Sequence, residues 1–495
     1  MKMKKIFYSI TLVASLGVLT GCSDFLDVND TPNNPLVVSP AVLLSNGLGG
    51  SAFADANELN RFTMTIMSVT TGVNNSPLAY DIYNTTAADF NNQWNGELYN
   101  GPLISYAHLI QRGDETGSKV YSGIAKIMMA YTFSLATDVW GDVPYSQALK
   151  GLDNTQPRLD KQEDIYKGNA SLGIQSLFDL VREGLADLNS TTNAFVPVAD
   201  DIIYGGVVAN WRRAANTLLL KFAMQISDRE PAMAVSVINE VIAGNNFIAT
   251  NAQNLAVRFG SETGSQSPIH QYTNVSAFRD DMIVSTRFLT LMQNLKDPRI
   301  PQMITSPNAK FTTLDNGFRG TPPTPTTTWS RLGTGITGVA GAGFVRMVTN
   351  AQRAFILAEA ALNLPGIVLP AGKTANDYFQ EGIKAHMADM GVADATVTAY
   401  FADPTNAALV TLTGTTADQH LQIMTQKYIS FAGNGIEQWN DWRRTGYPVL
   451  AQHQNAVGID GTRPVRAIYT TNEILRNPNF PGDVFQNVKV WWDVD

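Results

Sequence analysis

Residues Glu437–Pro448, Glu-Gln-Trp-Asn-Asp-Trp-Arg-Arg-Thr-Gly-Tyr-Pro, decide how the chain folds. The stretch predicts a short helix that ends at Gly446, because glycine readily adopts the left-handed conformation that closes a helix and Pro448 cannot continue one. Trp439 and Trp442 offer large apolar area with one hydrogen-bond donor each. We therefore interpret the stretch mainly as scaffold, rather than as a surface that touches a ligand.

Two arginines follow the tryptophans. Arg443 and Arg444 need carboxylate partners if they are buried, and the sequence offers Glu359 and Glu437 as candidates. The stretch is therefore expected to hold the fold together.

Helical patterns extend outward from this stretch in both directions. Apolar residues recur at spacings of three and four, and Ser, Thr or Asp precede several of the segments as helix caps. Ser39 before Pro40 starts the first predicted helix, which is expected to end near Gly49-Gly50. The further predicted segments are Asn57–Thr71, Trp94–Gly113, Tyr121–Asp138, a segment capped by Asp160-x-x-Glu163 and continuing to Leu188, Val208–Ile226, Pro231–Ala243, Gln352–Leu362, Thr374–Met390 and Thr415–Phe431.

The lengths of these segments predict antiparallel helix pairs. They are similar in length to tetratricopeptide units, although no regular consensus recurs at about 34 residues. Between the pairs, residues 245–279 and 298–346 are rich in Gly, Thr, Pro, Ser and Asn. Loop-dominated insertions of this length are usually functional or disordered.

Six short motifs, in order along the chain, resemble the SusD/RagB-type nutrient-binding lipoproteins of Gram-negative outer membranes. Each motif alone is weakly specific, but their common order and spacing are specific. The segment around Arg463–Asn477 matches the family's Arg-rich Tyr-Pro segment only loosely. The motifs are Ala136–Ser146, Trp211–Leu218, Lys296–Arg299, Phe355–Ala360, Tyr378–Ile383, and Gln426–Ile429 with Glu437–Pro448.

The resemblance implies a mainly α-helical fold with tetratricopeptide-like helix pairs and a loop-rich insertion region. Residues 22–495 would form a single SusD-like domain, in which 22–38 are a tether. The helical scaffold would comprise about 39–244 and 350–495, and the ligand-face insertions about 245–349.

The N-terminus resembles an export signal that ends in a lipobox. Three lysines precede an apolar run from Ile6 to Leu19, which is too short to span a bilayer, and Leu19-Thr20-Gly21 leads to Cys22. Residues 1–21 are therefore expected to be removed and Cys22 to be acylated, which would hold the protein durably at the membrane. The alternative is an ordinary signal peptide followed by an incidental free cysteine.

Composition excludes several classes of function. The formal net charge of −8 disfavours nucleic acid as a partner. One cysteine allows neither an intrachain disulfide nor a thiolate metal site.

The motifs of common enzyme classes are also missing. The five histidines show no His-Glu-x-x-His spacing. Gly333-x-Gly335-x-x-Gly338 lacks a preceding strand, so it is interpreted as a loop rather than a dinucleotide site. We expect no cofactor, no metal and no enzymatic activity, although dispersed carboxylates would leave glycoside hydrolysis open.

Ligand binding is better supported, through aromatic side chains in loops. Sugars pack their C–H faces on aromatic rings and bond their hydroxyl groups to polar side chains, and peptides use similar groups. For Trp94 the spacing shared with Leu98 favours core packing, and loop aromatics often cover their own domain. With the loops that the resemblance assigns to the ligand face, the candidate ligand-binding residues are Tyr80, Asp81, Tyr83, Asn84, Trp94, Tyr272 and Trp329.

The resemblance implies an outer-membrane lipoprotein that faces the cell exterior. It would bind an oligosaccharide or a peptide without changing it and deliver it to a SusC-like TonB-dependent transporter. The alternatives are a surface glycoside hydrolase or peptidase, and a structural surface module.

Overall fold

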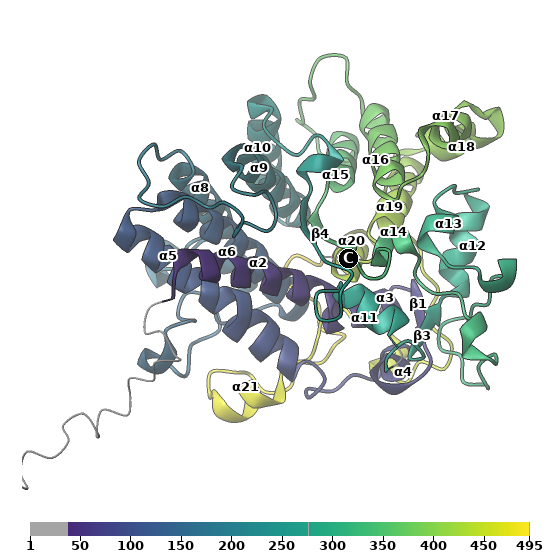
Figure 1. The fold of residues 1–495 in the computed structure, drawn as a ribbon, viewed down its shortest axis with the longest axis horizontal. Helices are drawn as coiled ribbons and strands as arrows, with labels where there is room; N and C mark the ends of the chain where they lie inside the picture. Colours follow the sequence, from purple (N-terminus) through teal and green to yellow (C-terminus); the bar gives the residue numbers. More distant parts are fainter. Residues whose placement is uncertain (1–37, 276, 495) are drawn as a thin grey trace, which may run out of the picture.

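The computed structural model describes residues 38–275 and 277–494. The predicted signal, the acylation site Cys22 and nearly all of the predicted tether lie outside the described residues. The described chain is mainly α-helical with two small β-sheets (Figure 1), which confirms the predicted fold class.

The N-terminal half is built around α6 (Lys119–Trp140), almost all of whose residues are buried. The neighbours α5 and α8 pack against it, and α9 follows beside α8 and α10. The bounds in this half are α2 (Pro40–Ala56), α3 (Glu58–Ile66), α4 (Asn75–Tyr80), the π-helix η1 (Gln93–Leu103), α5 (Ile104–Thr116), α7 (Gln162–Lys167), α8 (Leu177–Asp187), α9 (Val208–Gln225) and α10 (Pro231–Gly244).

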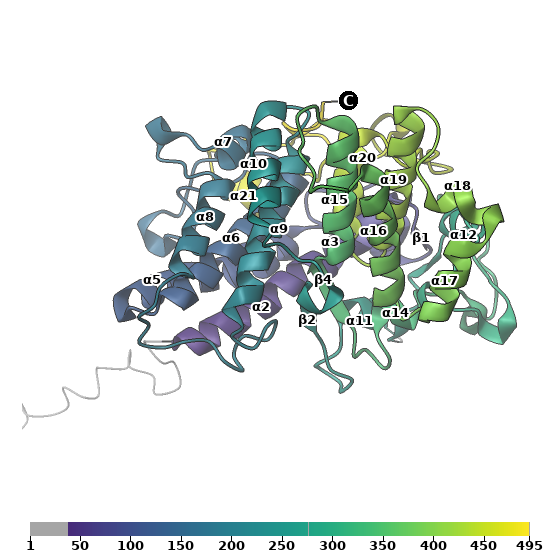
Figure 2. The ribbon, with the colours of Figure 1, turned by 90° about the horizontal axis from the view of Figure 1, so that it is seen from above.

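The C-terminal half adds further helix pairs. Figure 2 shows α9, α10, α15 and α16 running alongside one another, as tetratricopeptide-like pairs do, and α15 packs against both α16 and α19. The bounds are α15 (Asn350–Asn363), α16 (Ala375–Asp389), α17 (Asp394–Ala402), α18 (Ala407–Val410), α19 (Thr416–Ser430), α20 (Gly435–Thr445) and α21 (Thr471–Arg476).

The remaining elements are short. Strand β1 (Thr70–Gly72) pairs antiparallel with β3 (Met282–Val284), and β2 (Leu255–Arg258) pairs antiparallel with β4 (Phe344–Val348). The short helices here are α11 (Pro268–Asn274), α12 (Thr286–Asn294), α13 (Ile300–Met303) and α14 (Thr334–Thr337). Single 3-10 turns are η2 (Gly151–Asp153), η3 (Ala170–Leu172), η4 (Asn251–Gln253), η5 (Pro307–Ala309), η6 (Thr326–Thr328), η7 (Pro404–Asn406) and η8 (Ile459–Gly461).

Helix α20 joins the two halves, in agreement with its interpretation as scaffold. Arg444 forms a two-pronged ion pair with Glu359 of α15, at 2.7 and 3.0 Å, and both side chains are buried. Arg443 instead lies over the ring of Trp439, 3.8 Å from its centroid, and donates to the backbone oxygen of Asp138 in α6. The predicted helix stop is also confirmed, because Gly446 has a φ of +70°. The expected partner Glu437 pairs with Lys221 of α9, at 3.0 Å.

Three predicted helix boundaries are wrong. Helix α2 starts at the predicted Ser39 cap, whose side chain accepts from the Val42 backbone, but it continues through Gly49-Gly50 to Ala56. The second predicted helix ends at Ile66, because residues 70–72 pair with β3 instead. Asp160 caps no helix, because its carboxylate binds Arg158 at 2.8 Å. Instead of one long helix up to Leu188, the chain forms the short helix α7 and then α8, which has its own cap at Ser176.

The caps predicted at Thr374 and Thr415 are confirmed. Each side chain accepts from the backbone N–H three residues later, and the Asp there bonds back to the cap residue. These capping boxes depend only on neighbours in sequence, so the sequence could predict them.

Candidate functional site

Two distant segments meet beside the β1–β3 pair. Thr70 is paired with Val284, and the pairing continues beyond the strands, where the Val73 N–H donates to the Asp281 oxygen at 2.7 Å. The Asn74 side chain also donates to the Asp280 oxygen, at 2.7 Å. The loop after β1 and the loop before β3 therefore form one surface. We call it the loop face, and it comprises Asn74, Asn75, Phe278, Arg279, Asp280 and Arg331.

An exposed aromatic ring stands beside charged groups on the loop face. Phe278 is 45% exposed. Next to it, the Asp280 carboxylate accepts from Arg331 at 2.8 Å, from Arg279 at 3.3 Å and from the Thr326 hydroxyl at 3.1 Å. Partial burial of Asp280 is outweighed by these hydrogen bonds and cationic charges, which lower the pKa of its carboxyl group. Asp280 is therefore ionised at neutral pH.

Arg61 of α3 supports the loop face from beneath. Its guanidinium lies 5.6 Å from the ring centroid of Tyr272 and 5.7 Å from that of Phe278. Ion pairs to Glu58, at 2.7 Å, and to Asp281, at 3.0 Å, fix its position. Among the described residues, no acceptor takes a hydrogen bond from its buried Nε–H.

The predicted candidates Tyr80, Tyr272 and Trp329 lie beneath this region rather than on it. All three side chains are buried. The Tyr80 hydroxyl donates to Glu58 at 2.7 Å, the Tyr272 hydroxyl accepts from Asn60 at 2.9 Å, and the Trp329 indole donates to the Pro323 oxygen at 2.8 Å.

The expectation that these rings stand in loops is wrong for Tyr80 and Tyr272, which belong to α4 and α11. Trp329 does follow a Thr/Pro tract, but it packs inward on Val73 and Ile283. A direct role of the three rings in binding stays a prediction, and in this structure they support the loop face.

Trp94 lies in the core of the helical scaffold, in agreement with the packing interpretation. Its indole donates to Glu473 at 3.2 Å, and its ring meets that of Trp140 edge-on, with centroids 5.1 Å apart. Asn84 is the one exposed residue among the seven candidates.

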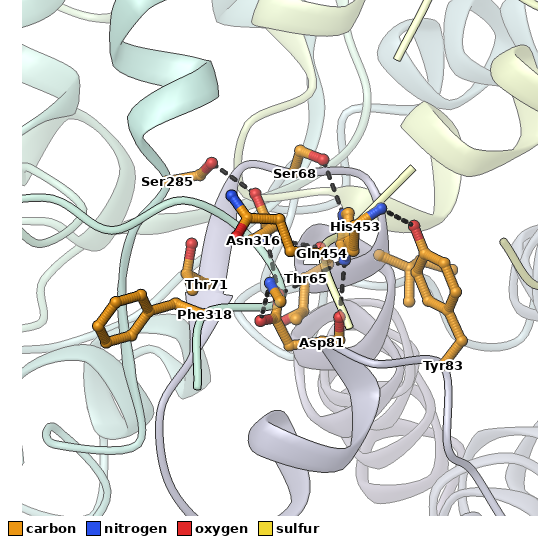
Figure 3. A network of polar contacts seen from close by, with 12 residues as sticks. Thr65, Ser68, Thr71, Asp81, Tyr83, Ser285, Asn316, Phe318, His453 and Gln454 are labelled. Carbon is orange, nitrogen blue, oxygen red and sulfur yellow. Dashed lines mark hydrogen bonds and ion pairs between the residues drawn. The ribbon is translucent and has the colours of Figure 1, made fainter. Parts of the chain in front are cut away.

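Asp81 and Tyr83 belong to a buried polar network, shown in Figure 3. The Asp81 carboxylate accepts from Asn316 at 2.8 Å and from the Gly317 N–H at 2.5 Å. His453 donates from its ring Nδ1 to the Asp81 backbone oxygen, at 2.8 Å, and its backbone N–H donates to the Tyr83 hydroxyl, at 3.2 Å. Three segments that are far apart in sequence are thereby held together.

Burial sets the charge states in this network. It raises the pKa of Asp81 to about 7, although hydrogen bonds from Asn316 and Gly317 oppose the shift. Burial and the nearby charge of Arg463 lower the pKa of His453 to about 3. The imidazole is therefore neutral, so its Nε2 can accept from the Ser68 hydroxyl at 2.9 Å. The 3.5 Å approach of His453 to the Asp81 carboxylate is accordingly not an ion pair.

Two hollows lie elsewhere on the surface of the described residues. One, of about 760 Å³, is lined by Lys373, Asp377, Glu381 and Lys384 along α16. The other, of about 530 Å³, lies beside α12 and α19, and its lining combines apolar residues such as Leu291 and Val449 with charged ones such as Arg287. Neither lining includes an aromatic ring as exposed as that of Phe278.

Residues 38–275 and 277–494 contain neither a cluster of metal ligands nor a helix suited to crossing a membrane. No three His, Cys, Asp or Glu side chains there come together as a metal site. No helix in the same ranges is both long and apolar enough to cross a bilayer.

Sequence reasoning missed the exposed members of the loop face. Phe278-Arg279-Asp280 places an aromatic residue directly before two charged residues, in a stretch without apolar periodicity. That pattern, rather than the presence of tyrosine or tryptophan, is the signal that could have identified Phe278.

Solved structures with the same fold cover nearly the whole chain. A SusD-like protein from Bacteroidetes has a TM-score of 0.77 at 19% identity and matches 92% of this chain and 100% of its own. A chitin-binding SusD homologue from Flavobacterium johnsoniae has a TM-score of 0.74 at 20% identity, over 91% of this chain and 99% of its own. A SusD homologue from Bacteroides thetaiotaomicron gives 0.73 at 20% identity, over 92% and 99%. At these identities, the likeness establishes the fold alone.

The family comparison covers most of the chain. No curated protein matches this sequence. The profile of the SusD-like family, described as starch-binding and associating with the outer membrane, matches residues 32–470. Together with the helical fold, this match shows that the chain belongs to the SusD-like family.

Proposed function

We propose that this protein captures an oligosaccharide on its loop face and releases it unchanged. The observation that carries the proposal is the exposed ring of Phe278 beside the ionised Asp280 and Arg331, in a chain of a starch-binding family. An aromatic face packs against the C–H face of a pyranose, while a carboxylate and a guanidinium bond to its hydroxyl groups.

The charge state of Asp280 favours binding over hydrolysis. A glycosidase needs a carboxylic acid whose raised pKa keeps it protonated, about 5 to 10 Å from a second carboxylate. Asp280 has a lowered pKa instead. Its neighbour Asp281 is buried and paired with Arg61 at 3.0 Å. Turnover of a glycan by the purified protein would favour the alternative of a surface hydrolase.

The proposed ligand is a neutral glucan or a chitin-type oligosaccharide. The family description points to starch, and one structural neighbour is described as chitin-binding. Both polymers are built from gluco-configured pyranose rings, whose C–H faces can pack on a flat aromatic ring. Binding of oligopeptides, with no response to either sugar, would instead assign the protein a peptide ligand.

The proposed location and partner follow from the N-terminal sequence and the family. We propose that Cys22 carries lipid, that the protein faces outward from the outer membrane, and that a SusC-like TonB-dependent transporter receives the ligand. Association of the two proteins after extraction of the outer membrane in mild detergent would test the partner directly.

The binding site is tested by a matched pair of phenylalanine variants. Phe278 is 45% exposed and Phe344, on β4, is 40% exposed, so neither truncation opens the core. In calorimetric titrations with maltoheptaose and chitohexaose, Phe278→Ala should weaken binding about tenfold, which corresponds to a loss of about 1.4 kcal/mol.

The control variant Phe344→Ala should bind as the wild type does. Phe344 lies between Arg258 and Arg346, at 5.9 and 5.6 Å, so it is also a reasonable stacking position. If Phe344→Ala weakens binding and Phe278→Ala does not, the proposed site on the loop face is incorrect.

A further inference from the structure

A run of exposed apolar side chains lies at the corner of the molecule where the described chain begins. In the connection between α8 and α9, Phe195 and Val198 are each 59% exposed. Val42, in the first turn of α2, is also 59% exposed. We call this set the apolar corner, and it comprises Val38, Val42, Phe195, Val196, Val198, Ile202 and Val207.

The two parts of the apolar corner are held side by side. The Ser45 hydroxyl of α2 donates to the backbone oxygen of Asp200, at 2.8 Å. Val42 lies three residues before Ser45 and therefore shares its side of the helix. Figure 2 shows the start of α2 and the α8–α9 connection at the same corner of the molecule.

The connection has a defined internal structure. The Phe195 N–H donates to Ser118 at 3.1 Å, and Asp200 accepts from the Tyr121 hydroxyl at 2.8 Å. Gly206, with a φ of +82°, lets the Pro197 oxygen approach so closely that a Cβ there would be 2.2 Å from it. The apolar side chains are therefore presented by a folded loop whose polar groups are bonded internally.

The position of this corner suggests its occupant. Val38 is the first described residue, and it lies sixteen residues after the proposed lipid-bearing Cys22. A chain of that length spans at most about 55 Å, which holds this corner at a high effective concentration near the bilayer. Residues 194–199, Ala-Phe-Val-Pro-Val-Ala, carry no charge that would have to lose its hydration on contact with lipid.

We propose that the apolar corner rests in the boundary between lipid headgroups and acyl chains, as a second contact beside the anchor. Phe and Val side chains gain free energy on leaving water there, and a second contact strengthens attachment through one lipidated residue. The contact would also fix which side of the protein faces the membrane. The inference rests on the proposed acylation of Cys22.

A pair of labelled valine variants tests this contact. Because Cys22 is the only cysteine and its thiol would be acylated, Val198→Cys or Val449→Cys would supply the one free thiol. Val449 is 77% exposed, and it lines the hollow beside α12, at the opposite end of the molecule from the start of α2 (Figures 1 and 2). Each acylated protein is labelled with a polarity-sensitive dye and reconstituted into phosphatidylethanolamine/phosphatidylglycerol vesicles.

The dye at residue 198 should shift its emission to shorter wavelength and be quenched by brominated acyl chains, while the dye at residue 449 should show neither effect. Equal, water-like emission from both positions in protein that floats with the vesicles would overturn the inference while leaving the anchor intact. Failure of both proteins to float would refute the anchor and with it the inference. A shift at residue 198 that appears only when a membrane protein partner is added would assign the corner to that partner and overturn the lipid contact.

Discussion

His453 is a buried imidazole that its surroundings keep neutral. Its two ring nitrogens have different partners, because one donates to the Asp81 backbone oxygen and the other accepts from Ser68. A second ring proton would face the Ser68 hydroxyl in a buried site near the Arg463 charge. The histidine is therefore a fixed link in the buried polar network around Asp81.

This neutrality predicts a pH dependence of stability. The pKa of His453 falls from 6.5 to about 3 on folding, so the unfolded chain takes up the proton first as the pH drops. The contribution of neutral His453 to the free energy of unfolding is fully present above pH 6.5 and is lost as the pH falls toward 3. Between pH 7 and 5 the wild type should lose about 2 kcal/mol relative to His453→Gln.

Urea unfolding of both proteins at several pH values measures that difference. Asp81, whose pKa is raised to about 7, titrates in both proteins and largely cancels in the comparison. Parallel stability curves for the two proteins would show that His453 is accessible to protons in the folded state.

Trp439 and Trp442 allow a direct comparison of burial on one helix. Trp439 is fully buried, donates to the Pro464 oxygen at 2.8 Å and meets the ring of Phe62 edge-on. Trp442 is half-buried beneath Arg463. Trp439→Ala should cost about 3–5 kcal/mol of unfolding free energy, and Trp442→Ala clearly less. Denaturant unfolding monitored by helical circular dichroism checks this order, and equal losses would contradict it.

The glycines of α2 show how a helix adapts to its neighbours. A Cβ at Gly47 would lie 2.5 Å from the ring of Tyr106, and one at Gly50 would lie 2.9 Å from Pro102. A Cβ at Gly49 would meet nothing within 4 Å. Gly47 and Gly50 therefore allow close packing of α2 against α5 and η1, whereas Gly49 has no such contact.

This difference predicts opposite effects of one substitution within one helix. Gly49→Ala should stabilise the protein by about 0.5–1 kcal/mol, because alanine loses less backbone entropy in a helix. Gly47→Ala should destabilise it by about 1–3 kcal/mol through overpacking against Tyr106. Thermal unfolding of the two variants tests both signs, and stabilisation by Gly47→Ala would show that Tyr106 moves aside readily.

The attachment of the protein to the membrane depends on one side chain, if the proposed acylation holds. Cys22→Ser would remove the only thiol and should move the protein from the membrane pellet to the soluble periplasmic fraction. Fractionation in detergent-free buffer, followed by mass spectrometry of the mature N-terminus, makes the measurement. Unchanged pelleting of the variant would argue against acylation, because the apolar corner alone is expected to bind only weakly.

The helical class and the family could be predicted from the sequence, because both depend on local patterns and short motifs. The caps at Ser39, Thr374 and Thr415 each involve residues only three apart. The ion pair between Arg444 and Glu359 was among the pairings that the sequence suggested, but which of the two arginines would take it was decided by the tertiary structure. The glycines of α2 could not be interpreted in this way, because their role depends on Tyr106 and Pro102 in other helices.

Which aromatic rings face solvent was decided only by tertiary structure. Tyr80, Tyr272 and Trp329 look in sequence like loop aromatics, as Phe278 does, yet only Phe278 remains exposed. Pairing of β1 with β3 brings together segments more than 200 residues apart, and Trp329 packs on Val73 and Ile283 beside that pair, while Tyr80 packs on Phe62 and Phe90. The exposure of a side chain depends on all the segments that pack around it. A local sequence pattern can therefore identify a helix or a family, but it cannot determine whether a given aromatic ring is exposed to water.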